Sequence, residues 1–173
     1  MGGSTLLNPP DLIIFSGNDW NEYENRIYDI YLNTVAQANL VFLGLPVKVR
    51  YLPDTRNKAY GFWHLISESP SQNNRNENDR IPDLRRCERI KWIAWCIQNA
   101  ESPGFSYWEN SRGRETHIVI WAENHDFVVI LARRCTQDGF KFYLLKTAYP
   151  IRERKKQKFI QERDRWWRQA QND

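Results

Sequence analysis

The sequence has few of the residues and patterns that mark several classes of protein. It contains only three cysteines, Cys87, Cys96 and Cys135, and none of them belongs to a CxxC pair. An odd number of widely spaced cysteines indicates neither a disulfide framework nor a zinc ribbon, so we expect reduced thiols and a cytoplasmic protein. Eight glycines and one methionine argue against fibrous and low-complexity classes.

Long hydrophobic runs are missing as well. The chain has no run of 18 apolar residues, and its first residues, MGGSTLLNPPD, show no basic segment leading into a signal-peptide core. We therefore expect neither secretion nor a membrane partner. With 173 residues the chain can bury one core without disulfides or metals, so a single domain over residues 1–173 is the simplest expectation.

Aromatic residues and, at one end, positive charge are plentiful. Trp, Tyr and Phe occur eight times each and provide apolar and stacking surfaces. The formal net charge is +4, and residues 151–173 hold eight Lys and Arg against four Asp and Glu. Charge concentrated in this way favours nucleic-acid binding. The candidate nucleic-acid-binding residues are Lys146, Arg152, Arg154, Lys155 and Lys156.

The first half of the chain has helical patterns and one short strand. Apolar residues three and four apart predict helices over 20–39 and 82–99, and FWHLISE lies in a short predicted helix over 60–68. The alternation in PVKVRYLP predicts a strand over 46–53. Residues 69–80 are rich in Asn, Ser and charge, which predicts a flexible loop.

The second half of the chain has strand patterns. The runs YWEN, ETHIVIWAEN, DFVVILARRC and FKFYLLKTAY are β-branched or aromatic, and SRGR, NHD and TQDG between them are typical of turns. Short connections predict an antiparallel meander. A basic helical tail over 151–173 follows. The fold class is therefore α+β, with N-terminal helices packed on one face of a C-terminal antiparallel sheet and a basic C-terminal helix.

Two groups in the helical half are candidates for chemistry. His64 has Glu68 four positions later, so on a helix the carboxylate could orient the imidazole, although a histidine on an aromatic-rich helix also serves as a packing residue. Arg85 and Arg86 lie in the basic segment DLRRCERIKW and can bind phosphate in bidentate fashion. Charge on the outer face of a helix also serves solvation alone.

The closing strand, FYLLKTAYP, ends in polar side chains. Strand alternation predicts that Thr147 and Tyr149 project from the same face, where both could donate to a phosphate. Lys146 is then expected on the opposite face unless a bulge re-aims it. The β propensity of Thr and Tyr explains their presence in a strand but not a polar cluster directly before Pro150 and a basic helix.

A metal site is not expected. The segment ENHD contains Glu123, His125 and Asp126, but its spacing matches neither HExxH nor a Cys/His ligand set, and a hairpin turn explains it better. His117 lies on a predicted strand and is equally well explained as a cross-strand polar partner.

The order of these motifs resembles a known superfamily. FWHLISE with its helical histidine, the basic second helix, and a meander that ends in LLKTAYP are similar to the barnase, EndoU, colicin and RelE superfamily of metal-independent ribonucleases. More narrowly, they resemble its phage- and mobile-element-associated branch. The resemblance covers residues 22–150, a nuclease-like core, and leaves out the basic tail.

The resemblance implies RNA cleavage by attack of a ribose 2′-hydroxyl on the adjacent phosphorus, which leaves a cyclic phosphate and needs neither a metal nor a cofactor. It implies that His64 is the general base or acid and that Arg85, Arg86 or both neutralise the phosphorane. Thr147 and Tyr149 would position the phosphate or assist proton transfer. This reaction needs a second acid–base or orienting group, and three candidates stay open: Glu68, Glu115 and His117.

The resemblance also implies partners. The substrate would be single-stranded RNA or structured loops, whose bases the aromatic residues could stack, and a toxin-like enzyme would be restrained by an antitoxin or immunity protein. The alternative is a non-catalytic nucleic-acid-binding or protein-interaction module on the same fold. That module would bind RNA in a salt-sensitive manner without forming a product.

Overall fold

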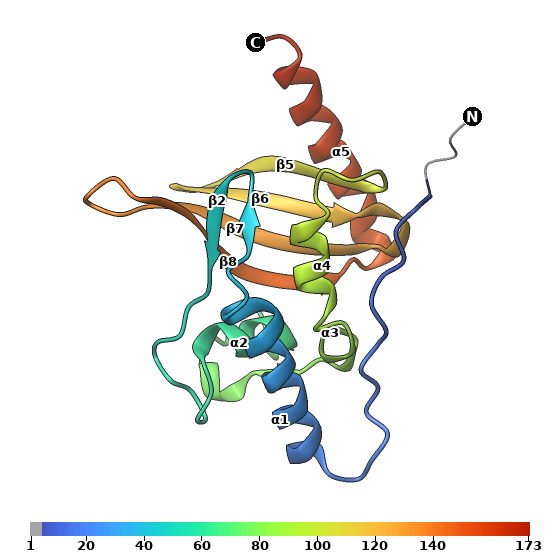
Figure 1. Ribbon diagram of the computed structural model, residues 1–173, viewed down its shortest axis with the longest axis vertical. Coiled ribbons are helices and arrows are strands. Elements are labelled where there is room, and N and C mark those ends of the chain that lie inside the picture. Colours follow the sequence, from blue (N-terminus) through green and yellow to red (C-terminus); the bar gives the residue numbers. More distant parts are fainter. Residues whose placement is uncertain (1–4) are drawn as a thin grey trace.

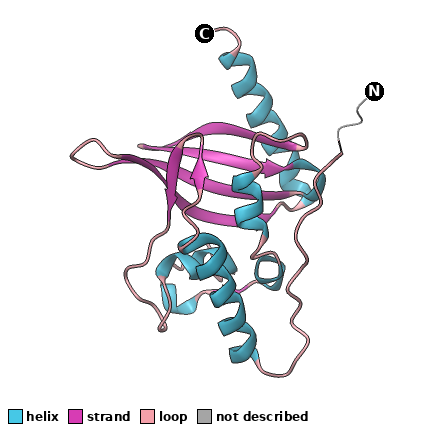
Figure 2. Cartoon of the chain, in the orientation of Figure 1, coloured by secondary structure: helices cyan, strands magenta, loops and turns pink. Residues whose placement is uncertain are grey.

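A curled six-stranded sheet forms the centre of the fold (Figures 1 and 2), which a computed structural model describes for residues 5–173. The strand order is β1–β2–β8–β7–β6–β5, and the last four strands form the predicted antiparallel meander. β2 joins the meander in parallel beside β8, a pairing that the sequence did not reveal. The strands are β1 Val41–Phe42, β2 Leu45–Lys48, β5 Phe105–Arg112, β6 Glu115–Ala122, β7 Phe127–Cys135 and β8 Lys141–Pro150.

The helices precede and follow this meander. They are α1 Trp20–Tyr31, α2 Tyr60–Ile66, α3 Leu84–Glu88, α4 Trp92–Gln98 and α5 Glu153–Ala170, and a π-helical segment Leu32–Ala36 extends α1. Two short strands, β3 Ser67–Glu68 and β4 Ile81–Pro82, pair with each other outside the main sheet. Two 3-10 turns lie at Glu77–Asp79 and Glu123–His125. No helix within residues 5–173 is both long enough and apolar enough to cross a membrane.

The two faces of the sheet bury different cores. On one face, the N-terminal helices pack against alternate residues of the meander, as Ile27, Phe62 and Ile93 do with Ile120 and Leu131. On the other face, α5 covers a second cluster. The period-two alternation of β6 and β7 assigns each of their residues to one face. The predicted α+β class, with helices on one face of the sheet and a C-terminal helix, is confirmed.

Three predicted elements differ from the structure. The helix predicted over 82–99 is two helices, because the chain turns between Glu88 and Trp92 and Ile90 is fully buried in that turn. The strand predicted over 46–53 ends at Lys48, and the backbone carbonyls of Arg50 and Tyr51 accept hydrogen bonds from the start of α2 instead. The helix predicted over 60–68 ends at Ile66, because the chain becomes extended from Ser67.

The loop over 69–80 has more structure than expected, whereas the C-terminal tail is helical as predicted. The loop contains the 3-10 turn Glu77–Asp79, and its mobility stays a prediction. Residues 151–173 lie outside the part of the chain that the resemblance covers, and two of them, Ile151 and Phe159, are buried in the second cluster. Residues 1–4 begin the N-terminal segment in which no signal peptide is expected, and they lie outside the described residues.

Candidate active site

Helix α2 is held against the end of β8. In its first turn, Gly61 N donates a 2.8 Å hydrogen bond to the carbonyl of Arg50. Only glycine fits at position 61, because a Cβ there would lie 2.9 Å from Arg50 O. At the other end of the helix, Thr147 Oγ1 donates a 3.0 Å hydrogen bond to the carbonyl of His64. The helical histidine and the closing strand are therefore in direct contact.

A β-bulge decides which side chains of β8 share a face. Ile130 pairs with Thr147 and Leu131 pairs with Leu145, so Lys146 is an extra residue without a partner in the register. The bulge shifts the alternation by one residue: Leu145 faces the main core before it and Ala148 faces that core after it. The bulge therefore brings Lys146 to the same side as Thr147 and Tyr149, against the simple alternation.

These side chains border a hollow on the sheet face that α5 only partly covers. We call this cavity of about 250 Å³ the His64 hollow. Most of its lining residues lie on strands, because alternate side chains of β5 and β6 project from the same face of the sheet as those at the bulged end of β8. Its lining residues are His64, Arg112, His117, Val119, Ile130, Lys146, Thr147 and Tyr149.

His64 is paired with a carboxylate, but not with the predicted one. Its Nε2 lies 3.0 Å from Glu77 Oε2, in the loop over 69–80. Glu68 cannot be a helical neighbour, because α2 has already ended at Ile66. Glu68 instead forms ion pairs with Arg86 at 3.9 Å and with Arg152 at 3.6 Å.

The protonation of His64 is set by opposing influences. Burial, and after it the positive charge of Arg80, lowers the pKa of His64 below its ordinary value, although Glu77 acts in the opposite direction. The imidazole is therefore neutral at neutral pH. With Nε2–H donated to the Glu77 carboxylate, Nδ1 keeps a free lone pair, which is the state that a general base requires.

Tyr149 presents a protonated phenol. Burial raises the pKa of Tyr149, although Arg112 and Arg86 oppose this effect. Its hydroxyl makes no hydrogen bond with the part of the chain that the structure describes. The guanidinium of Arg86 lies 5.3 Å from the ring centroid, a cation–π contact that holds the ring in place. The phenol is thus fixed in orientation and available to donate to a ligand.

Arg86 has a supporting position. Its Nη1 donates to the carbonyls of Ser67 at 3.1 Å and His64 at 3.4 Å, and its guanidinium also pairs with Asp83 at 3.6 Å. These contacts join the end of α2 to α3 and to β8. Arg86 therefore positions His64 and Tyr149, whereas Arg85 is exposed and lies outside the His64 hollow.

His117 is the second histidine of the His64 hollow. Its Nε2 lies 2.8 Å from Glu115 Oε2 on the same strand. Glu115 also accepts a 2.6 Å hydrogen bond from Arg134 and lies 3.9 Å from Lys146 Nζ. The hydrogen bonds with His117 and Arg134 lower the pKa of Glu115 to about 2. This carboxylate is therefore ionised at neutral pH and orients His117.

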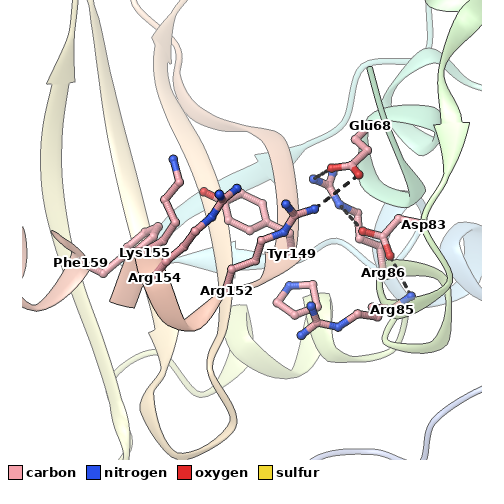
Figure 3. Close-up of a pocket in the computed structure, with 10 residues that line it drawn as sticks. Glu68, Asp83, Arg85, Arg86, Tyr149, Arg152, Arg154, Lys155 and Phe159 are labelled. Atoms are coloured by element: carbon pink, nitrogen blue, oxygen red, sulfur yellow. Dashed lines mark hydrogen bonds and ion pairs between the residues drawn. The ribbon is translucent and has the colours of Figure 1, made fainter. Parts of the chain in front are cut away.

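A second cavity, which we call the basic hollow, shares Tyr149 with the His64 hollow, and Figure 3 draws the residues that line it. Its volume is about 300 Å³. Figure 3 shows residues of α3 at one end, residues of α5 at the other, and Tyr149 between them. The lining residues are Glu68, Asp83, Arg85, Arg86, Tyr149, Pro150, Arg152, Arg154, Lys155 and Phe159.

The predicted site residues fall into three groups. Five of them border the His64 hollow: His64, His117, Lys146, Thr147 and Tyr149. A second set borders the basic hollow: Glu68, Arg85, Arg86, Arg152, Arg154 and Lys155. Two residues lie outside both hollows: Glu115, which holds His117, and Lys156, which pairs with Asp126 at 3.2 Å.

Sequence reasoning missed two residues. Glu77 lies in a loop without periodicity, and Arg112 lies beside a turn, so neither belongs to a pattern that predicts a role. Within residues 5–173, no three His, Cys, Asp or Glu side chains gather as metal ligands. Glu123 and Asp126 of the ENHD segment pair with Arg163 and Lys156 of α5.

Comparisons with protein-family models, with curated proteins and with solved structures find no match to this chain. A function must therefore be argued from the geometry of the two hollows.

Proposed function

We propose that this protein is a metal-independent endoribonuclease that cleaves RNA by 2′-hydroxyl attack and leaves a cyclic phosphate. One observation carries the proposal: two carboxylate-bound histidines, a lysine and an unengaged tyrosine hydroxyl border one hollow. The reaction needs two proton-transfer groups and donors for a phosphorane, and the hollow provides both. The sequence resemblance points to the same chemistry.

The two histidines take different roles in this proposal. Neutral His64 accepts the proton of the 2′-hydroxyl while O2′ forms a bond to phosphorus. His117, held by Glu115, is the remaining acid–base group of the hollow and gives a proton to O5′ as the bond from phosphorus to O5′ breaks. Of the three candidates for the second group, the geometry favours His117 for proton transfer and Glu115 for its orientation.

Three side chains stabilise the charge that develops on the phosphorane. Lys146 and Arg112 bring positive charge to the hollow, and the Tyr149 phenol donates a hydrogen bond. Thr147 takes a different role from the expected one, because its hydroxyl proton is used on the His64 carbonyl. It positions the base rather than the phosphate.

The proposal includes a cellular setting. A cytoplasmic, toxin-like enzyme restrained by an antitoxin or immunity protein agrees with the resemblance to ribonucleases of phages and mobile elements. The three cysteines agree with a reducing compartment, since Cys87 and Cys96 are buried and all three are free thiols.

Incubation with total RNA in the presence of EDTA tests the chemistry. We expect cleavage products that end in a 2′,3′-cyclic phosphate. His64→Ala and Tyr149→Phe should each lower kcat by about 100-fold or more, because each removes a proton-transfer or charge-stabilising group. Tyr51→Phe is the matched control, since Tyr51 is exposed and its hydroxyl bonds to Ala36 O. A requirement for metal, or full activity in both site variants, would overturn the proposed mechanism.

The basic hollow favours a second candidate function, a non-catalytic nucleic-acid-binding module. Its cations lie outside the His64 hollow and need no chemistry in order to bind phosphate. This alternative predicts salt-sensitive RNA binding with no product at any time, and unchanged binding in His64→Ala.

A further inference from the structure

Apart from Tyr149 and Arg86, the residues of the basic hollow have no part in the chemistry proposed for the His64 hollow. Five cations and two carboxylates line it. The carboxylates of Glu68 and Asp83 are engaged by Arg86 and Arg152. The other three cations, Arg85, Arg154 and Lys155, form no ion pair with any residue among 5–173. The cavity therefore keeps free positive charge for a ligand.

The position of this charge indicates the kind of ligand. Tyr149 borders both hollows, and the chain passes directly from Tyr149 through Pro150 to Arg152 and the first turn of α5. Guanidinium groups match the geometry of phosphate oxygens, and an ammonium group adds a mobile donor. Because the two hollows share Tyr149, a ligand with regularly spaced phosphates can place one phosphate in each of them.

We propose that the basic hollow is a subsite for the backbone phosphate of a nucleotide that flanks the scissile bond. The preferred substrate is then an RNA strand that continues past the cleaved dinucleotide. This inference rests on the proposed ribonuclease function. The subsite would be a second point at which the protein holds the RNA strand. Arg154 and Lys155 of α5 and Arg85 of α3 hold the flanking phosphate, whereas the residues of the His64 hollow hold the scissile one.

Short substrates of defined length test the subsite. A dinucleoside monophosphate has only the scissile phosphate, and the same compound with a terminal 5′- or 3′-phosphate adds a flanking one. We expect one phosphorylated form to be cleaved with a kcat/KM about tenfold above that of the minimal substrate, as one charge-assisted contact provides. The double variant Arg154→Gln/Lys155→Gln should bring this ratio close to one.

A second double variant controls for total charge. Arg165→Gln/Arg168→Gln removes two exposed cations from the same helix, and neither residue borders the basic hollow. This variant should keep the preference for the phosphorylated substrate. An equal loss of the ratio in both double variants would overturn the subsite, because it would show a general attraction. A wild-type ratio near one for both terminal phosphates would overturn it as well.

The same experiment separates the two proposals. Cleavage of every substrate at one rate would overturn the subsite and leave the ribonuclease in place. No cleavage of these substrates or of total RNA would overturn the ribonuclease. In that case, binding of 2′-O-methyl oligonucleotides with one or two phosphates decides the subsite. Tighter binding of the longer form, lost in Arg154→Gln/Lys155→Gln, supports it, and equal binding overturns it.

Discussion

His64 is half-buried between an acidic and a basic neighbour, and this environment determines the pH at which it can act. Burial and Arg80 lower its pKa, and Glu77 opposes them. A general base must be neutral to accept a proton. For the proposed ribonuclease, the kcat/KM of the wild-type protein should therefore rise with pH, with the midpoint of its acidic limb below the ordinary histidine pKa of about 6.5.

Removing the charge of Glu77 tests this assignment. Glu77→Gln keeps a hydrogen-bond acceptor but loses the carboxylate that stabilises the imidazolium, so the pKa of His64 should fall further. The acidic limb of the kcat/KM profile should then move to lower pH, in step with the His64 titration followed by NMR. Glu101→Gln, at an exposed position, should leave both curves in place. A limb that moves to higher pH would contradict the role of His64 as base.

At the level of single residues, part of the site could be predicted from the sequence. His64, Thr147 and Tyr149 belong to motifs with a recognisable order, and alternation gave the shared face of the last two. The partner of His64 could not be predicted, because Glu77 lies 13 positions away in a polar loop without a pattern. The direction of Lys146 depended on a bulge, and no residue type in KTAYP specifies one.

Among the elements, α5 is a predicted helix with a packing role that the sequence did not reveal. Its charge suggested an appended basic tail, but its apolar side packs on the sheet. Phe159 is only 8% exposed and belongs to the second cluster, with its ring centroid 6.2 Å from that of Trp108. The apolar side of α5 can be recognised from helical spacing in the sequence. The surface on which it packs cannot, because it forms only when the sheet brings Trp108, Trp121 and Val128 of β5, β6 and β7 to one face.

A truncation of the side chain at Phe159 measures this packing. Phe159→Ala should lower the free energy of unfolding by about 3 kcal/mol, because it removes a buried aromatic ring and leaves a cavity. Gln161→Ala, at an exposed position of the same helix, should change it by less than about 0.5 kcal/mol. Urea denaturation followed by tryptophan fluorescence gives both values. Equal effects of the two substitutions would show that α5 does not pack on the sheet in solution.

The packing of α5 also changes which experiments are informative. Deletion of residues 152–173 would expose Trp108 and Trp121, so a loss of RNA binding in the truncated protein would not separate affinity from folding. Substitution of exposed cations leaves the apolar side of the helix intact. The contribution of α5 to the proposed RNA binding is therefore measured with side-chain variants of the full chain.

For the whole molecule, the location of the cations matters more than the net charge. Residues 151–173 contain four cations that pair with carboxylates: Arg152, Lys156, Lys158 and Arg163. The other four form no ion pair with residues 5–173: Arg154, Lys155, Arg165 and Arg168. The sequence shows the excess of +4 but not this division, which depends on where the fold places Glu68, Glu123 and Asp126.

This division predicts how the proposed RNA binding responds to salt. Each phosphate of a single strand that a cation neutralises contributes about −0.7 to the slope of log K against log salt. With a non-cleavable 2′-O-methyl RNA, Arg154→Gln/Lys155→Gln should reduce the magnitude of that slope by about 0.7, because these two side chains hold one flanking phosphate. Lys156→Gln should change it little, because Asp126 already balances that charge at 3.2 Å. Binding titrations over a range of salt concentrations measure the slopes. A change in Lys156→Gln half as large as that in the double variant would mean that total charge, rather than the basic hollow, governs binding.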